Sequence, residues 1–417
     1  MKNLNTFLGV LLFTFIAIML STPLYSMPNF ARKYNMGCSS CHAPIPKLNE
    51  FGFKFRAAGF RLPDEIGKDI TTENLGDYFA GRIQSRYDLA RSESPTGIVT
   101  NTNQFTFAEI TLYPATGAYG KYLSSLIEMS FLPDEAAEIE NGYVKVSFGK
   151  EKQYFTAKAG IFHPFEGYGA SDRPLGLSRP LFQTTTANFN QSTAFKPWGY
   201  DQTGIELGYS INNTFIRATI FNGIVGTTGK PAQGGALNKA KTDLSYNDKD
   251  LQLTITQILA DNGGGITGYF YSGKVDLNTG LTGGTDPKLF QNSFTRYAFY
   301  ASYPFQNALL LGGYQKGQDD SFNKTLKTKG DTFNSNGFFG ELDYKVDEPI
   351  WLGLRYAQFT PAENISNNKI NNVTGIVNYS FDNGLQLIGE YNYKSSEKGV
   401  NLTQKDNSFQ LRIIYIY

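Results

Sequence analysis

Cysteine and histidine are scarce in this 417-residue sequence, which holds two of each, and neither sign of charge is in excess. Lys and Arg total 38 against 37 Asp and Glu, so the chain lacks the basic surplus that nucleic-acid binding requires. No Ser-His-Asp set, phosphate-binding loop or zinc motif is present. Beyond residue 27, no apolar run approaches the roughly 20 residues of a membrane-spanning helix. Membrane insertion of that part must therefore use strands.

The N-terminus has the pattern of a secretory signal peptide over residues 1–26. Lys2 provides the charged start, an apolar run follows over 7–20, and Ser26 is a small residue suited to the cleavage point. The apolar run is short for a membrane span, and Leu24 fits the −3 position of a cleavage site poorly. An uncleaved anchor is the alternative, and either reading predicts export from the cytoplasm.

Cys38, Ser39, Ser40, Cys41 and His42 form a C-x-x-C-H, the attachment motif of c-type haem. In this motif two thiols bond the haem and the adjacent His supplies an axial iron ligand. The rival readings are a disulfide, a thioredoxin-like redox pair and half of a zinc site. A zinc site needs further Cys or His nearby, and a thioredoxin motif needs a βαβ pattern; neither is present. The motif predicts one covalent haem c held by Cys38, Cys41 and His42.

The second axial ligand of the iron is open at this point. Residues 43–74 contain neither Met nor His, which leaves Met27, Met36, Met129 and His163, or open coordination. Met36 precedes Cys38 by only two residues, and Met27 would begin the mature chain. Met129 and His163 share the parity of lipid-facing strand residues, and His163 is expected near the outer rim of the barrel described below.

The haem segment, residues 27–75, resembles the fused outer-membrane monohaem cytochrome c–porin family of iron-oxidising bacteria. The matching pieces are Phe30-Ala31-Arg32 before the motif, and Pro46-Lys47-Leu48-Asn49 and Phe51-Gly52 after it. The resemblance implies a tiny cytochrome before a sixteen-stranded barrel, with electrons crossing the outer membrane from extracellular Fe(II). Residues 48–59 can form a short helix. The apolar side chains expected to cover the haem edge are Leu48, Phe51, Phe55 and Phe60.

Residues 76–417 read as an outer-membrane β-barrel built from segments of about ten residues with alternating polarity. Sixteen such strands are predicted. Their spans are 78–90, 104–114, 120–131, 141–149, 152–162, 199–211, 213–224, 250–259, 264–275, 292–303, 307–317, 334–345, 350–360, 369–380, 384–395 and 407–417.

The connections alternate between short and long, as barrel topology requires. Short turns are expected around residues 149–151, 212, 304–306, 347–349 and 381–383. The long loops between them are 91–103, 163–198, 225–249, 276–291, 318–333 and 396–406. If the first strand starts in the periplasm, every short turn is periplasmic. In the last strand, 407–417, aromatic and apolar residues occupy every second position. Closure of the barrel would pair this strand with the first one, so that it is not left as an exposed edge.

Successive residues of a strand face opposite sides of the barrel wall. This alternation assigns the charged side chains to the lumen, because a charge on the lipid face costs about 2–4 kcal/mol near the midplane. In 384–395, Leu387 and Tyr391 face lipid while Gln386 and Glu390 face inward, and in 350–360 Arg355 faces inward. The other lumen charges are Arg82, Arg86, Glu109, Glu128, Lys145, Lys158, Glu206, Arg217, Glu341, Asp343, Lys345 and Arg412. Loop 163–198 is either folded inward as a constriction or lies on the surface.

The sequence thus predicts an all-β, porin-like barrel in the outer membrane of a Gram-negative (diderm) bacterium, preceded by a very small helical cytochrome. We expect electron transfer across the membrane, with Fe(II) as donor or substrate and a periplasmic c-type cytochrome as partner. Three alternatives remain open: outward export of electrons, a diffusion porin whose haem is structural or sensory, and a soluble periplasmic cytochrome with a β domain.

Overall fold

The computed structural model describes residues 29–43, 45–71, 74–133, 136–165, 167, 174–185, 187–189, 192–194, 201–225, 249–259, 264–277, 290–323, 328–381 and 384–417. The predicted signal peptide and Met27 lie outside these residues. No helix in this described part is long and apolar enough to cross a membrane.

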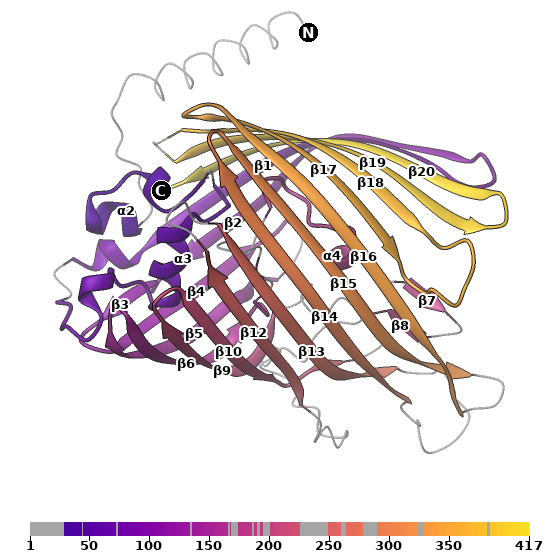
Figure 1. Cartoon of the computed structure of the whole chain (residues 1–417). Helices are drawn as coiled ribbons and strands as arrows, with labels where there is room; N and C mark the ends of the chain where they lie inside the picture. The colour runs from indigo at the N-terminus through magenta and orange to yellow at the C-terminus, as the bar shows by residue number, and fades with distance from the viewer. Residues whose placement is uncertain are drawn as a thin grey trace, which may run out of the picture.

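The dominant element is a closed antiparallel barrel (Figure 1). Each strand pairs with the next in the chain, and β20 pairs with β1 to close the ring. The sixteen barrel strands are β1 (Ala80–Glu93), β2 (Val99–Tyr113), β4 (Leu123–Phe131), β5 (Glu138–Lys150), β6 (Gln153–Phe162), β9 (Gln202–Ile211), β10 (Thr214–Phe221), β12 (Asp250–Ile258), β13 (Gly265–Leu277), β14 (Phe290–Phe305), β15 (Ala308–Asn323), β16 (Thr328–Asp347), β17 (Ile350–Thr360), β18 (Ile370–Ser380), β19 (Leu385–Gly399) and β20 (Leu402–Ile416).

Each of the sixteen predicted spans overlaps one of these strands, so the barrel prediction is confirmed. Short strands accompany the barrel: β3 (Gly117–Tyr119) pairs with β4, β11 (Ile224–Val225) with β13, and β7 (Ala187–Phe189) with β8 (Ser192–Ala194). Among the described residues, tight turns follow β5, β9, β14 and β16 where predicted. Asn212, for example, adopts φ 50° between β9 and β10, a left-handed conformation that Asn tolerates.

The two faces of the barrel wall segregate by polarity as predicted. Leu354 on β17 is 58% exposed on the outside, whereas its neighbour Arg355 is fully buried inside and pairs with Glu341 at 3.0 Å. None of the twelve other predicted lumen charges is exposed on the outer face. The outward side chains are mainly Leu, Ile, Val, Phe and Tyr, which suits contact with lipid.

The N-terminal segment forms short helices that enter the barrel at the end where the tight turns lie (Figure 1). These are α2 (Asn29–Tyr34), η1 (Cys38–Ser40), α3 (Glu50–Ala57), η2 (Pro63–Glu65) and η3 (Leu75–Tyr78). The expected helix over 48–59 is therefore present as α3. Because outer-membrane barrels have their short turns on the periplasmic side, we assign this end of the barrel to the periplasm.

Contacts to opposite walls hold this N-terminal segment within the barrel. Lys47 forms an ion pair of 3.0 Å with Asp343 on β16, and both side chains are almost completely buried. The backbone oxygen of Ile45 accepts hydrogen bonds from Asn378 on β18 (2.8 Å) and Gln386 on β19. On the other side, buried Arg61 donates to the backbone oxygens of Gly120 and Leu123, both at 3.0 Å. The segment therefore spans the lumen from wall to wall.

The described part of loop 163–198 also lies inside the barrel. This agrees with the prediction of a loop that folds inward as a constriction, and not with a loop on the surface. The backbone NH of Leu175 donates to Glu341 (2.9 Å), and that of Leu177 donates to Glu390 (2.6 Å). The loop contains α4 (Leu181–Thr184), whose Leu181 and Phe182 pack into the apolar cluster on the barrel wall. The carboxylates that parity placed in the lumen thus position this loop.

Candidate functional site

The three residues of the C-x-x-C-H motif line one cavity between the N-terminal helices and the barrel wall. Cys38 and Cys41 lie on and directly after η1, and His42 follows. The cavity measures about 320 Å³, and β1, β2, β4 and β20 supply its far side. We call it the motif cavity. The motif side chains thus line the same space, bounded by the N-terminal helices and the barrel wall.

A short network of backbone contacts fixes the motif against α3. Asn49 caps α3 by accepting from the NH of Gly52 at 2.9 Å, and its amide donates to the backbone oxygen of Ser40 at 3.0 Å. His42 Nδ1 lies 3.2 Å from the backbone oxygen of Lys47. Such a bond orients an imidazole and leaves Nε2 as the ligating atom. His42 is therefore held in the way that a metal-ligating histidine requires.

Aromatic side chains make up much of the wall of the motif cavity. Phe30 stacks on Phe60 with ring centroids 4.8 Å apart and meets Phe55 edge-to-face at 5.1 Å. Phe51 and Leu48 complete this wall, so the four side chains expected to cover the haem all line the cavity. Tyr34 also lines it and donates to Glu65 at 3.0 Å; burial, with Glu65 nearby, raises the pKa of Tyr34. The phenol therefore stays neutral.

The motif cavity has the features that a haem requires: two thiols, an oriented imidazole and an apolar enclosure. Cys38 and Cys41 are not joined by a disulfide. Burial, reinforced by the neighbouring Cys38, raises the pKa of the Cys41 thiol to about 11. Thiol–disulfide catalysis instead depends on a lowered pKa and a thiolate. The environment of the two cysteines therefore argues against a thioredoxin-like redox pair.

The candidates for the second axial ligand separate in space. Met36 lines the motif cavity together with Cys38, Cys41 and His42. His163 does not; it lines a neighbouring cavity, where its Nδ1 lies 2.6 Å from Asp201 Oδ1. The expected lipid-side position of His163 is wrong, because the chain leaves β6 at Phe162 and His163 lines a cavity together with lumen side chains. Met129, on β4, does not line either cavity.

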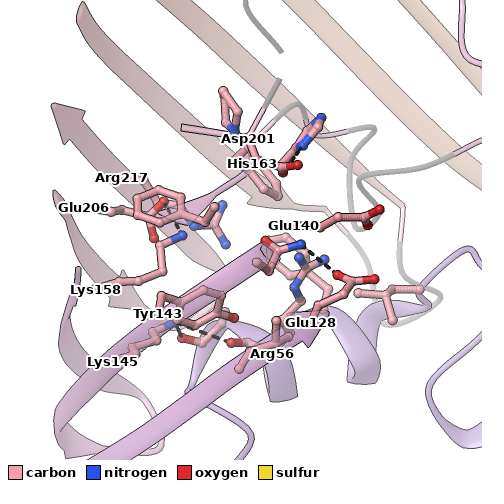
Figure 2. Close-up of a pocket in the computed structure, with 18 of the residues that line it drawn as sticks. Arg56, Glu128, Glu140, Tyr143, Lys145, Lys158, His163, Asp201, Glu206 and Arg217 are labelled. Carbon is pink, nitrogen blue, oxygen red and sulfur yellow. Dashed lines mark hydrogen bonds and ion pairs between the residues drawn. The ribbon is translucent and has the colours of Figure 1, made fainter. Parts of the chain in front are cut away.

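The neighbouring cavity, which we call the charged cavity, contains most of the ionisable side chains around α3 (Figure 2). It measures about 190 Å³ and shares Leu48, Arg56, Leu126 and Glu128 with the motif cavity. Lys158 and Glu206 form an ion pair of 3.1 Å inside it. The basic side chains are Arg56, Lys145, Lys158, Arg179 and Arg217, and the acidic ones are Glu128, Glu140, Asp201 and Glu206.

A third hollow lies on the opposite side of the motif, at the periplasmic end. Cys38, Ser39 and His42 form one wall, and the opposite wall is formed by Trp351 and the turns flanking β17 and β18. The motif residues thus separate a lumen-facing cavity from a groove at the periplasmic end.

The lumen carboxylates are occupied by partners within the protein. Glu109 pairs with Arg82 at 3.0 Å, and Glu128 accepts from Tyr113 and Asn141, both at 2.8 Å. Within the described part of the chain, no cluster of three or more His, Cys, Asp or Glu side chains has the arrangement of a metal site. Glu109 and Glu128 therefore bind other side chains of the barrel wall, whereas Asp343, Glu341 and Glu390 hold the N-terminal segment and the inner loop.

Sequence comparison identifies no relative: neither the family models nor the curated proteins match this chain. Solved structures do match its fold. The anion-selective porin from Comamonas acidovorans is 10% identical, with a TM-score of 0.55 over 81% of this chain and 98% of that one. The outer-membrane channel DcaP of Acinetobacter baumannii is 10% identical, with a TM-score of 0.53 over 84% of this chain and 100% of that one.

A loop-deletion mutant of OmpT from Vibrio cholerae is 12% identical, with a TM-score of 0.51 over 81% of this chain and 98% of that one. At these identities the similarity concerns the fold alone. This protein is accordingly a porin-like β-barrel of the Gram-negative outer membrane.

Two features of the site are not foreseen by sequence reasoning. Lys47 belongs to the matching pieces of the family resemblance, but its ion pair with Asp343 joins positions 296 residues apart. Arg56 lies between buried Phe55 and Ala57 on α3 and reaches both cavities. The available signal was its place in the sequence, on a short aromatic helix that also carries Lys54.

Proposed function

We propose that the protein carries one haem c, bound through Cys38 and Cys41 and ligated by His42, and transfers electrons across the outer membrane. The single observation that carries this proposal is that all three motif residues line one aromatic cavity between the N-terminal helices and the barrel wall. When bound, the haem supplies reversible one-electron chemistry at its iron. Fe(II) is the donor we propose, and a periplasmic c-type cytochrome is the partner we propose.

The residues of the chain have separate parts in this function. His42, oriented by the backbone oxygen of Lys47, would ligate the haem iron, and Met36 is the other candidate ligand among the described residues that line the motif cavity. Phe30, Phe55 and Phe60 would supply the apolar wall against the haem. The charged cavity opens on the lumen side, and the groove at Cys38 and His42 opens toward the periplasm.

The resemblance of Phe30-Ala31-Arg32 and Pro46-Lys47-Leu48-Asn49 to the cytochrome–porin family supports the inward direction of electron flow. Electron export to an external acceptor would use the same residues. The direction is set by the potentials of the partners, which the residues of the cavity do not encode.

A second candidate function is that of a diffusion porin whose haem is structural or sensory. The solved structures that share the fold favour this candidate, because they are described as porins, channels or outer-membrane proteins. The N-terminal segment and the inner loop argue against free diffusion, since both occupy the lumen in the described structure. Passage of small solutes through the haem-loaded protein distinguishes the two functions.

The test of the electron-transfer proposal is stopped-flow mixing of the purified, haem-loaded protein with Fe(II) at neutral pH while the haem α-band is recorded. Rapid reduction is the expected result. Reduction by dithionite but not by Fe(II) would remove iron as the donor. A protein without covalent haem, made in a host with the c-type maturation system, would overturn the proposal.

Liposome swelling with the same preparation tests the second function. We expect sugar uptake far below that of an open porin incorporated at equal density. Swelling at the rate of an open porin would favour the diffusion role.

A further inference from the structure

The stretch between His42 and Leu48, which we call the motif loop, closes on itself. Its two ends form an antiparallel bridge, and the NH of Ala43 donates to the backbone oxygen of Lys47 at 2.9 Å. The same oxygen lies 3.2 Å from His42 Nδ1. Because a carbonyl oxygen can only accept, a hydrogen bond between them requires the proton to be on Nδ1, which leaves Nε2 as the ligating nitrogen. The position of one backbone oxygen thus decides the tautomer of His42.

The barrel wall anchors the motif loop at two points. Lys47 Nζ pairs with Asp343 Oδ2 on β16 at 3.0 Å, and both side chains are buried. The backbone oxygen of Ile45 accepts from Asn378 on β18 at 2.8 Å and from Gln386 on β19. The loop is therefore held at Ile45 by hydrogen bonds and at Lys47, the residue that carries the acceptor for His42, by an ion pair.

Asp343 has the properties of a residue that fixes a position. Its strand, β16, lies within the barrel and pairs with β15 on one side and β17 on the other, so its backbone is held from both sides. A buried ion pair adds little stability compared with apolar side chains of similar volume, whereas it does specify which groups meet. Precise sites need such supporting residues on rigid elements. The Lys47–Asp343 pair meets this requirement for the motif loop.

We infer that Asp343 is a positioning residue for His42. Through Lys47, it fixes the backbone oxygen that holds the imidazole proton on Nδ1. This inference rests on the proposed function, in which His42 ligates the haem iron. Asp343 lies 296 positions after Lys47 in the sequence, so the axial histidine acquires its orientation only when β16 is part of a folded barrel. The barrel is then a structural component of the haem site as well as its enclosure.

The test is NMR of the full-length protein in detergent, isotope-labelled at the imidazole nitrogens and prepared reduced and without haem. The chain has two histidines, so the variant His163→Gln assigns the signals, and His163, paired with Asp201, then serves as an internal reference. At about pH 8.5, above the ordinary pKa range of histidine, the nitrogen shifts report which nitrogen carries the proton. We expect a single tautomer for His42, with the proton on Nδ1.

Asp343→Asn should convert the His42 signals to those of a mixture of tautomers and leave the His163 signals unchanged. Asp343→Glu, which keeps the charge, should retain most of the single tautomer. The matched control is Glu206→Gln, because Glu206 is also a buried lumen carboxylate in an ion pair, but its partner at 3.1 Å is Lys158 on the barrel wall. This control should leave His42 unchanged.

A general release of the N-terminal segment would also disturb His42, so its cleavage by added protease is measured in the same samples. The double variant Lys47→Met/Asp343→Leu replaces the ion pair by apolar side chains and leaves no unpaired charge. It should remain as resistant to protease as the unsubstituted protein and still show the mixture of tautomers. This variant therefore separates positioning of His42 from docking of the segment.

The inference would be overturned by a single Nδ1-protonated tautomer in the double variant, or by a mixture in the unsubstituted protein. A change in Glu206→Gln as large as that in Asp343→Asn would also overturn it. If Asp343→Asn does not fold, the double variant decides the question. The spectra need no haem, whereas failure of the proposed function would appear as a protein without covalent haem from a host that matures c-type cytochromes. The two failures are therefore distinguishable.

Discussion

Gly52 shows, at the scale of one residue, how tightly the motif is built. A Cβ atom at this position would lie 2.2 Å from the backbone oxygen of Cys41, far inside van der Waals contact. That oxygen accepts the NH of Asn49, which caps α3, so neither partner can move without loss of the cap. Gly52 therefore allows the helix to approach the motif closely enough to orient it.

We predict that Gly52→Ala destabilises the docking of α3 by about 1–3 kcal/mol, the usual cost of overpacking. The yield of covalently bound haem, measured by haem staining of denaturing gels, should decrease. The control is Gly340→Ala on β16, where a Cβ atom meets nothing within 4 Å. Equal haem yields in the two variants would contradict the prediction.

A second prediction at this scale concerns the sixth ligand of the iron. Because Met36 lines the motif cavity and His163 does not, Met36→Ala should abolish the methionine–iron charge-transfer band and lower the midpoint potential. His163→Ala should preserve both. Visible spectroscopy of the oxidised proteins makes this comparison, and a spectrum of Met36→Ala identical to that of the unsubstituted protein would exclude methionine ligation.

At the scale of elements, the N-terminal segment depends on its buried ion pair. Removing one partner of such a pair leaves an uncompensated charge, which costs about 3–5 kcal/mol. We predict that Lys47→Gln releases the segment around Ile45 from β16, β18 and β19 and accelerates its cleavage by added protease. Lys68→Gln is the matched control, since its pair with Asp64 is exposed on both sides.

The double variant Lys47→Gln/Asp343→Asn separates the charge effect from a general loss of packing. It removes both charges and should restore part of the protease resistance. If protease cleaves the double variant as fast as Lys47→Gln, the faster cleavage is due to lost packing and not to the unpaired charge.

The elements also show what sequence reasoning can and cannot predict. The strands follow from period-two alternation, because any shift of one residue would turn Arg355 or Glu390 toward lipid. The position of His163 could not be deduced in this way, since parity applies only while the chain remains in the strand. The depth of the N-terminal segment was equally inaccessible, because it depends on pairs such as Lys47 and Asp343 between distant parts of the sequence.

At the scale of the whole molecule, the barrel is stable only if its outer face remains apolar. We predict that Leu354→Arg, on the outward face of β17, lowers the free energy of unfolding from lipid vesicles by about 2–4 kcal/mol if it lies near the midplane. Urea titration followed by tryptophan fluorescence measures this change. Glu348→Arg serves as control, because Glu348 lies exposed in the turn before β17, and a comparable loss in both variants would contradict the lipid-facing assignment.

The contacts that hold the N-terminal segment also have a consequence for biogenesis. Ile45 and Lys47 bind residues 296 to 341 positions further along the chain, on strands β16, β18 and β19. Contacts between such distant positions form late, because a long loop must first be closed. Until these contacts form, the motif is not yet held between the walls of the barrel. Under the proposed function, enzymes that attach haem would reach the motif in this interval, so that attachment of the cofactor would precede docking of the segment.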